Sequence, residues 1–294
     1  MRNYIQSSFS QSNSRCTTDT FSQDSECQYT GQGLSFSSGT NIFKYVEFTG
    51  CSLSTHGGAI KSTGGTVSII SSSFSSCTAN GNNGGAIYAA SLSLLSITNT
   101  LFNSCGGDHE VKSGGAIALS SVSSINLFDD LFLMCYSGNN AGAIDMRNCG
   151  SQQRELPIQC SFFIHCECLK GDGPSAGALE GSGNKCGYFA SVLFSSCKST
   201  DAGALWLEPL YYSHSICFSF FTGNSASNKG MDCYLRTNVD SDLFLDCFST
   251  SAPPHLYASD SSWNDLHLSD NWHHSRCEIK NFTPFTTQTY HKQY

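Results

Sequence analysis

The sequence has little charge and no long hydrophobic run. Only 13% of its 294 residues are Asp, Glu, Lys or Arg, and the formal net charge is −8. Lys and Arg nowhere form a cluster, which argues against nucleic acid or an anionic membrane as a partner. A transmembrane helix needs about 18 or more consecutive apolar residues, and the chain has no such run. We therefore predict no membrane-spanning helix.

Signals for helices and for export are also missing. No heptad and no sustained helical apolar stripe occurs, whereas Ser, Asn, β-branched residues and 27 Gly favour strands and tight turns. The N-terminus, MRNYIQSSFSQSNSR, lacks the apolar segment of a secretory signal. We expect either that the protein stays inside the cell or that the chain starts within a longer gene product, so the localisation is left open.

A short pattern is present instead, and it recurs along most of the chain. Phe-x-x-Cys is followed 6 to 11 residues later by Gly-Gly-Ala-Ile or a close variant, as in FSSCTANGNNGGAIYA at residues 74–89. The recurring phenylalanines are Phe48, Phe74, Phe102, Phe132, Phe163, Phe194, Phe221 and Phe244. The cysteines are Cys51, Cys77, Cys105, Cys135, Cys166, Cys197 and Cys247, with Asn224 in the seventh unit. The glycines are Gly58, Gly85, Gly115, Gly142, Gly177 and Gly203, with a degenerate Gly230.

A repeat of this length indicates stacked units that bury their apolar faces against one another. The leucine-rich pattern is absent, and the density of Ser, Gly and Asn opposes helical repeats. Three short strands per unit predict an all-β, right-handed parallel β-helix of 8–9 coils, each of about 27 residues and about 4.8 Å above the last. We expect an N-terminal polar segment at 1–20, the repeat domain at 21–248 and a C-terminal cap at 249–294.

Stacking predicts columns of equivalent side chains. The Phe and Cys columns should point inward, and the glycines should lie where φ is positive or another backbone approaches closely. Period-2 alternation from the glycine places an Ile or Leu inward and the next residue outward. The outward residues are Lys61, Tyr88, Ala118, Asp145, Glu180 and Trp206.

The repeat pair resembles that of the polymorphic outer membrane protein family, with Cys where that family usually has Asn. The resemblance covers about Phe21 to Cys247. It implies a right-handed β-helix of the pectin-lyase-like type, a cell-surface or secreted location, and a stalk that adheres to a host-cell protein or glycan. The family's secretion signal and membrane-anchoring barrel are not recognisable in this chain, and the oligomeric state is left open.

The 16 cysteines allow two interpretations. Column cysteines can pack as buried thiols, because Cys behaves as a small apolar residue. Disulfides are the alternative, since column neighbours fall within the Cα separation that a disulfide tolerates. Disulfides are expected more among the cysteines outside the column, which are Cys149, Cys160, Cys168, Cys186, Cys217 and Cys233.

No metal or cofactor is predicted. Cys160, Cys166 and Cys168 lie close together beside His165, but alternation sends His165 away from the inward Cys166. The tail residues His267, His273, His274 and Cys277 have no recognised ligand spacing.

Three functions remain open, and the first is a non-catalytic surface stalk. It would bind through the outward residues Tyr88, Asp145, Glu180 and Trp206, and through the long loops GGDHEVKSG and ECLKGDGPSA. The second is a polysaccharide lyase or glycoside hydrolase with Asp145 and Glu180 as its acids, since successive turns would hold them about 5 Å apart. The third is an intracellular scaffold. Motifs typical of the fold's hydrolases are absent, so we expect no enzyme.

Overall fold

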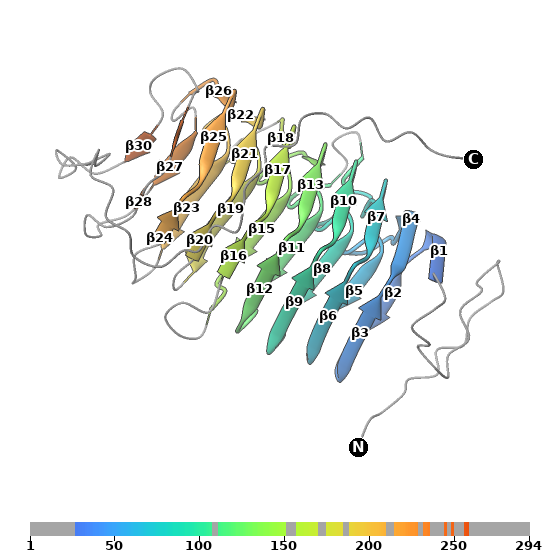
Figure 1. The fold of residues 1–294 in the computed structure, drawn as a ribbon. Helices are drawn as coiled ribbons and strands as arrows, with labels where there is room; N and C mark the ends of the chain where they lie inside the picture. The colour runs from blue at the N-terminus through green and yellow to red at the C-terminus, as the bar shows by residue number, and fades with distance from the viewer. Residues whose placement is uncertain are drawn as a thin grey trace, which may run out of the picture.

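The protein is a stack of parallel strands wound into one solenoid (Figure 1). The computed structural model describes residues 27–107, 111–150, 157–169, 175–184, 188–209, 215–228, 232–235, 244–245, 248–249 and 256–258. All the structure in these residues is strand, turn or bend, with no helix. The all-β parallel solenoid predicted from the repeat is therefore confirmed.

Sheet A carries the strands with the recurring phenylalanines. Its nine strands follow one another in chain order. They are β1 (Cys27–Gln32), β4 (Val46–Ser52), β7 (Ser73–Ser75), β10 (Leu101–Asn103), β13 (Leu131–Leu133), β17 (Phe162–Ile164), β21 (Leu193–Ser195), β25 (Phe220–Thr222) and β29 (Phe248–Ser249).

Sheet B carries the strands that follow the glycines. They are β2 (Leu34–Phe36), β5 (Ile60–Ser62), β8 (Ile87–Ala90), β11 (Ile117–Ser120), β15 (Ile144–Arg147), β19 (Leu179–Asn184), β23 (Leu205–Pro209), β27 (Cys233–Leu235) and β30 (Leu256–Ala258).

Sheet C closes each turn, and sheet D is a narrow ladder between sheets A and B. Sheet C contains β3 (Thr40–Lys44), β6 (Thr66–Ile70), β9 (Leu94–Thr98), β12 (Ile125–Phe128), β16 (Pro157–Gln159), β20 (Tyr188–Ala190), β24 (Ser215–Cys217) and β28 (Phe244–Leu245). Sheet D contains β14 (Tyr136–Ser137), β18 (Glu167–Cys168), β22 (Lys198–Ser199) and β26 (Ser225–Ala226).

The regular part of the solenoid makes about 6 turns, slightly fewer than the 8–9 coils expected. Sheets A and B each reach nine strands because less complete layers extend the stack, such as the two-residue strand β29. Strand β30 pairs with β27 and so continues sheet B into the segment expected to be a cap. The predicted N-terminal segment, 1–20, lies outside the described residues, as does most of 249–294.

The phenylalanines form one continuous stack inside the solenoid. From Phe48 to Phe221, neighbouring ring centroids are 4.7–5.1 Å apart and the ring planes differ by 1–13°. Strand pairing holds these residues in register, as in Phe102 opposite Phe132. Ring spacing therefore equals the spacing between parallel strands, so every turn places its ring on the last.

The two ends of this stack differ from the sequence alignment. Tyr29 begins it, with its ring 4.9 Å from that of Phe48. Phe244 was expected to continue it, but its strand β28 pairs with β24 in sheet C, opposite Ile216. Ser249 instead takes the register next to Phe221. The 23-residue interval misassigned Phe244, because a shortened last unit offers two phenylalanines and spacing alone does not choose between them. Cys247 lies outside the described residues.

The corner after each ladder phenylalanine uses one left-handed residue. The residue just before the column cysteine has φ between 51° and 54° in five turns. These residues are Ser76, Ser104, Met134, His165 and Ser196. A single residue in this region turns the chain sharply, and the stacked neighbours hold it there at a cost of about 1–3 kcal/mol per residue. The exposed His165 thus lies at a corner, away from the buried Cys166.

The glycine column exists because backbones of adjacent turns come very close. A Cβ on Gly85 would collide with the carbonyl oxygen of Gly115, and the same contact recurs from Gly58 to Gly177. The preceding glycine has a different role, since Gly84 adopts φ +73°. Both explanations that the sequence suggested therefore hold, each for one of the two glycines.

The column cysteines hydrogen-bond to the turn before them. In five consecutive turns the thiol lies 3.5–3.7 Å from the carbonyl oxygen of the preceding ladder phenylalanine, as in Cys105 with Phe74. Asn224 makes the equivalent bond in its turn, donating to the Phe194 carbonyl at 3.1 Å while accepting from the Cys197 N–H at 2.9 Å. The column position thus requires a buried side chain that can donate a hydrogen bond to a backbone carbonyl, and both Cys and Asn can do so.

The described column cysteines are free, fully buried thiols. They are Cys51, Cys77, Cys105, Cys135, Cys166 and Cys197. This agrees with the thiol-stack interpretation for the column. Outside the column, Cys149 is also a free thiol, and Cys186 lies outside the described residues.

Replacing Phe102 by Ala should lower the free energy of unfolding by about 3–5 kcal/mol, because it opens a cavity in the ring stack. The control is Phe128→Ala, since Phe128 is 41% exposed and should cost far less. Urea unfolding monitored by circular dichroism measures both. Equal losses in the two variants would contradict the ring stack as the main source of stability.

The column thiols should react with iodoacetamide only after unfolding. The reactive species is the thiolate, and the described column sulfurs are fully buried, so the reagent cannot reach them in the folded protein. Mass spectrometry of native and urea-treated protein, both unreduced, measures the labelling. Rapid labelling of Cys135 in the native protein would contradict the buried column.

Candidate functional site

The outward residues singled out by alternation do lie in one row along sheet B. Strand pairing brings each of them opposite the next, and Tyr234 extends the row. The row is Lys61, Tyr88, Ala118, Asp145, Glu180, Trp206 and Tyr234. The inward neighbours, such as Ile117, are fully buried.

The row is not open to solvent, contrary to expectation. Asp145, Glu180 and Trp206 are each only 2% exposed, while Tyr88 is half-buried. Alternation identifies the face on which a side chain lies, but it carries no information about what covers that face. We therefore correct the expectation that the outward residues Asp145, Glu180 and Trp206 are accessible for binding.

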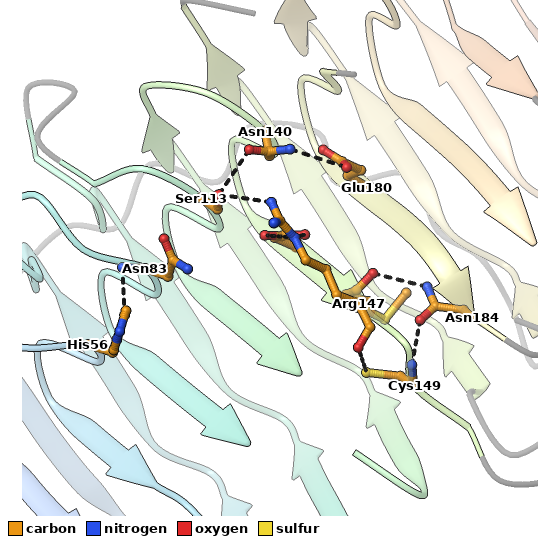
Figure 2. A network of polar contacts seen from close by, with 10 residues as sticks. His56, Asn83, Ser113, Asn140, Arg147, Cys149, Glu180 and Asn184 are labelled. Carbon is orange, nitrogen blue, oxygen red and sulfur yellow. Dashed lines mark hydrogen bonds and ion pairs between the residues drawn. The ribbon is translucent and has the colours of Figure 1, made fainter. Parts of the chain in front are cut away.

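Side chains from neighbouring corners and strands close over the two acids (Figure 2). Arg147 Nε lies 3.0 Å from an Asp145 carboxylate oxygen, and its Nη2 donates to Ser113 Oγ at 3.3 Å. Ser113 in turn donates to Asn140 Oδ1 at 3.0 Å, and Asn140 Nδ2 donates to Glu180 Oε1 at 3.3 Å. The network therefore links three turns and leads from one acid to the other.

The two carboxyl groups differ in their surroundings. Burial raises the pKa of Asp145, and the adjacent Arg147 guanidinium opposes that shift. Burial, with repulsion from Asp145, raises the pKa of Glu180 to about 8, although Asn140 and Arg147 act in the opposite direction. Within the described part of the chain, Glu180 Oε2 has no hydrogen-bond partner. The raised pKa favours the protonated form of Glu180 near neutral pH, while Asp145 is paired with Arg147.

Along the row, an aromatic stack lies on each side of the two acids. Trp206 stacks on Tyr234 with ring centroids 3.7 Å apart and joins Ala176 and Ala202 in a small buried cluster. Two strands away from Asp145, in the other direction, Tyr88 stacks on His56.

His56 completes that second stack as a hydrogen-bond acceptor. Its ring centroid is 4.4 Å from that of Tyr88, and its Nδ1 accepts from the Asn83 N–H at 3.2 Å (Figure 2). Burial, together with Lys61 and Lys112, lowers the pKa of His56. A neutral ring is what this acceptor contact requires.

Among the described residues, no group of three or more His, Cys, Asp or Glu is placed to hold a metal ion. Cys166 is buried in the thiol column, whereas His165 is exposed at its corner. The tail residues His267, His273, His274 and Cys277 lie outside the described residues. The centres of the two long loops, at 108–110 and 170–174, do so as well.

Sequence reasoning found the two acids but missed the residues that cover them. Arg147 could have been found, because it lies two residues after Asp145 and so shares its face. Ser113 and Asn140 sit at corners, where alternation does not apply. Only the winding of the solenoid places Ser113 beside Arg147 and Asn140 beside Glu180.

Comparisons with known proteins give no match: no family model, no curated protein and no solved structure matches the chain. Among the described residues, none forms a helix long and apolar enough to cross a membrane.

Replacing Glu180 by Gln should stabilise the protein increasingly as pH rises from about 4.5 to about 8, because only the folded state keeps Glu180 protonated in this range. The unfolded wild type ionises there, which costs the folded state at most about 1.4 kcal/mol per pH unit. Urea unfolding at several pH values measures the difference between variant and wild type.

Glu47→Gln is the control for the loss of one negative charge, since Glu47 is only half-buried on the outside of sheet A. A difference for Glu180→Gln that stays constant or shrinks with pH would show that Glu180 is ionised in the folded protein.

Proposed function

We propose that the chain is a non-catalytic interaction protein, in which a rigid solenoid carries outer side chains and loops that contact a protein or glycan. The features that recur in every turn support this proposal, because Phe, Cys, Gly and Ile are all used inside the stack. The outer positions and the loop lengths, by contrast, differ widely between turns. The resemblance of the repeat to that of surface stalks points in the same direction.

The observation that carries the proposal is the closure over Asp145 and Glu180. A general acid must reach the atom that it protonates, yet both acids are 2% exposed and bonded to Arg147 and Asn140. Their hydrogen bonds join successive turns, as the thiol and ring columns do inside. We interpret this network as a brace on the outside of sheet B.

A third buried acid, Asp130, supports the same interpretation. Asp130 is fully buried at a corner, where Oδ1 accepts from the Thr100 N–H at 2.9 Å. Its own N–H donates to Ser161 Oγ at 3.3 Å in the next turn. Burial raises the pKa of Asp130 to about 8. Asp130 thus joins backbone groups of neighbouring turns, as the network of Asp145 and Glu180 joins side chains of neighbouring turns.

One observation favours the alternative, a polysaccharide-active enzyme. The pKa of Glu180 is raised to about 8, and its direct neighbour in the sheet, Asp145, forms an ion pair with Arg147. Two neighbouring carboxyl groups in different surroundings are what glycoside hydrolysis uses for its separate acid and base roles. For this function the Asn140 and Arg147 side chains would have to move away from the acids.

The two functions are separated by incubating the full chain with uronic-acid and neutral polysaccharides and assaying new reducing ends and unsaturated products. We expect no product, and we expect the same chain to bind cells or a glycan array. Product formation that disappears in Glu180→Gln would overturn the proposal in favour of the enzyme. Heat-unfolded protein controls for nonspecific binding, and equal binding by native and unfolded chains would also count against the proposal.

A further inference from the structure

The outer side of sheet A changes character along the stack. One residue before each ladder phenylalanine, the side chain points outward, and strand pairing aligns these residues in one row. The row begins with polar residues and continues with apolar ones. It is Gln28, Glu47, Ser73, Leu101, Leu131, Phe162, Leu193 and Phe220.

The parallel row, one residue after each ladder phenylalanine, widens the apolar part. It contains Thr49, Ser75, Asn103, Leu133, Ile164, Ser195 and Thr222. We define the apolar face as the seven apolar residues of the two rows. They are Leu101, Leu131, Leu133, Phe162, Ile164, Leu193 and Phe220, and they lie on the adjacent strands β10, β13, β17, β21 and β25.

The apolar face is partly open to solvent. Phe220 is 37% exposed, and the other six residues are half-buried. None of the seven is needed inside, because the ring stack already fills the inner side of these strands. Strand propensity does not account for them either, since Leu is a weaker strand former than the Thr or Val that an outer position could carry. A contiguous exposed apolar patch of this kind marks a contact surface.

We propose that the apolar face packs against the same face of a second copy of this chain, forming a weak symmetric dimer. This inference goes beyond the proposed function and does not depend on it. An identical face has the same spacing of about 4.8 Å between its rows, so side chains of one copy fit between those of the other across a twofold axis.

Charge selects this face for self-association. The chain carries a net charge of −8, so two copies repel each other. The apolar face has no charged residue, whereas its polar continuation includes Glu47. Contact through the apolar face therefore meets the least repulsion, and salt should strengthen it by screening the remaining charges.

The size of the face sets the expected strength. Five strands about 4.8 Å apart, each of three residues, present roughly 20 Å by 10 Å of sheet. Even with the flanking side chains, the two copies bury less than the roughly 1,200 Å² of a standard interface. We therefore expect a concentration-dependent equilibrium between monomer and dimer and no permanent dimer.

Sedimentation equilibrium of the full chain at several concentrations, in low and high salt, tests the proposal. We expect a monomer–dimer equilibrium that high salt strengthens, and Leu131→Lys should weaken dimerisation by about tenfold or more, since the symmetric contact loses two leucines and gains two charges. The matched control is Ser73→Lys, which adds the same charge in the same row on a polar strand and should leave dimerisation close to that of the wild type.

Leu131→Ser introduces the residue that this row already contains at Ser73, and it should weaken dimerisation without adding charge. Circular dichroism melting confirms that each variant is folded. A wild type that stays monomeric at all concentrations overturns the proposal, and it would point to a segment of the same chain or another protein as the occupant of the face. Dimerisation that Leu131→Lys and Leu131→Ser leave unchanged also overturns it, because the contact would then lie elsewhere.

Discussion

The separation between parallel strands, about 4.8 Å, is the constraint on which the rest of this structure depends. Every turn of the chain lies one such step above the last, so the residue at each position must pack against the equivalent residue of the next turn at that distance. Phenylalanine rings do so at 4.7–5.1 Å, close to their preferred offset contact. Where backbones rather than side chains meet, only glycine fits, as at Gly85 against Gly115. The sequence repeats because the same separation between strands recurs at every turn.

A core built in this way leaves no interior space for function. Its polar positions are used to join turns: thiols and Asn224 donate to the carbonyls of ladder phenylalanines, and Asp130 accepts from the Thr100 N–H. The exchange of Cys for Asn in one column follows from this role, since both residues place a donor beside the same kind of carbonyl.

The outside has two faces of opposite character. On sheet B, a row containing acids and aromatic residues is closed by Arg147 and Asn140, so the residues that look most like catalysts act between turns. On sheet A, Leu131 and Leu193 are half-buried on either side of Phe162 in the outer row. The side chains with the most reactive groups thus lie on sheet B, whereas the more accessible apolar side chains lie on sheet A. If the chain is an interaction protein, as we propose, a contact surface is better sought among the accessible residues.

The sequence by itself determined the solenoid, its three-strand turn and the inward columns, because a regular spacing imposes a regular sequence. It also identified the row that holds Asp145 and Glu180, since alternation within a strand is a local property. It misplaced Phe244, where a shortened unit breaks the regularity. The cover over the row became visible only in the folded chain, because Ser113 comes from the turn before Asp145 and Asn140 from the turn before Glu180. Whether the acids are covered depends on how far side chains extend from one turn to the next, and local sequence patterns contain no information about that distance.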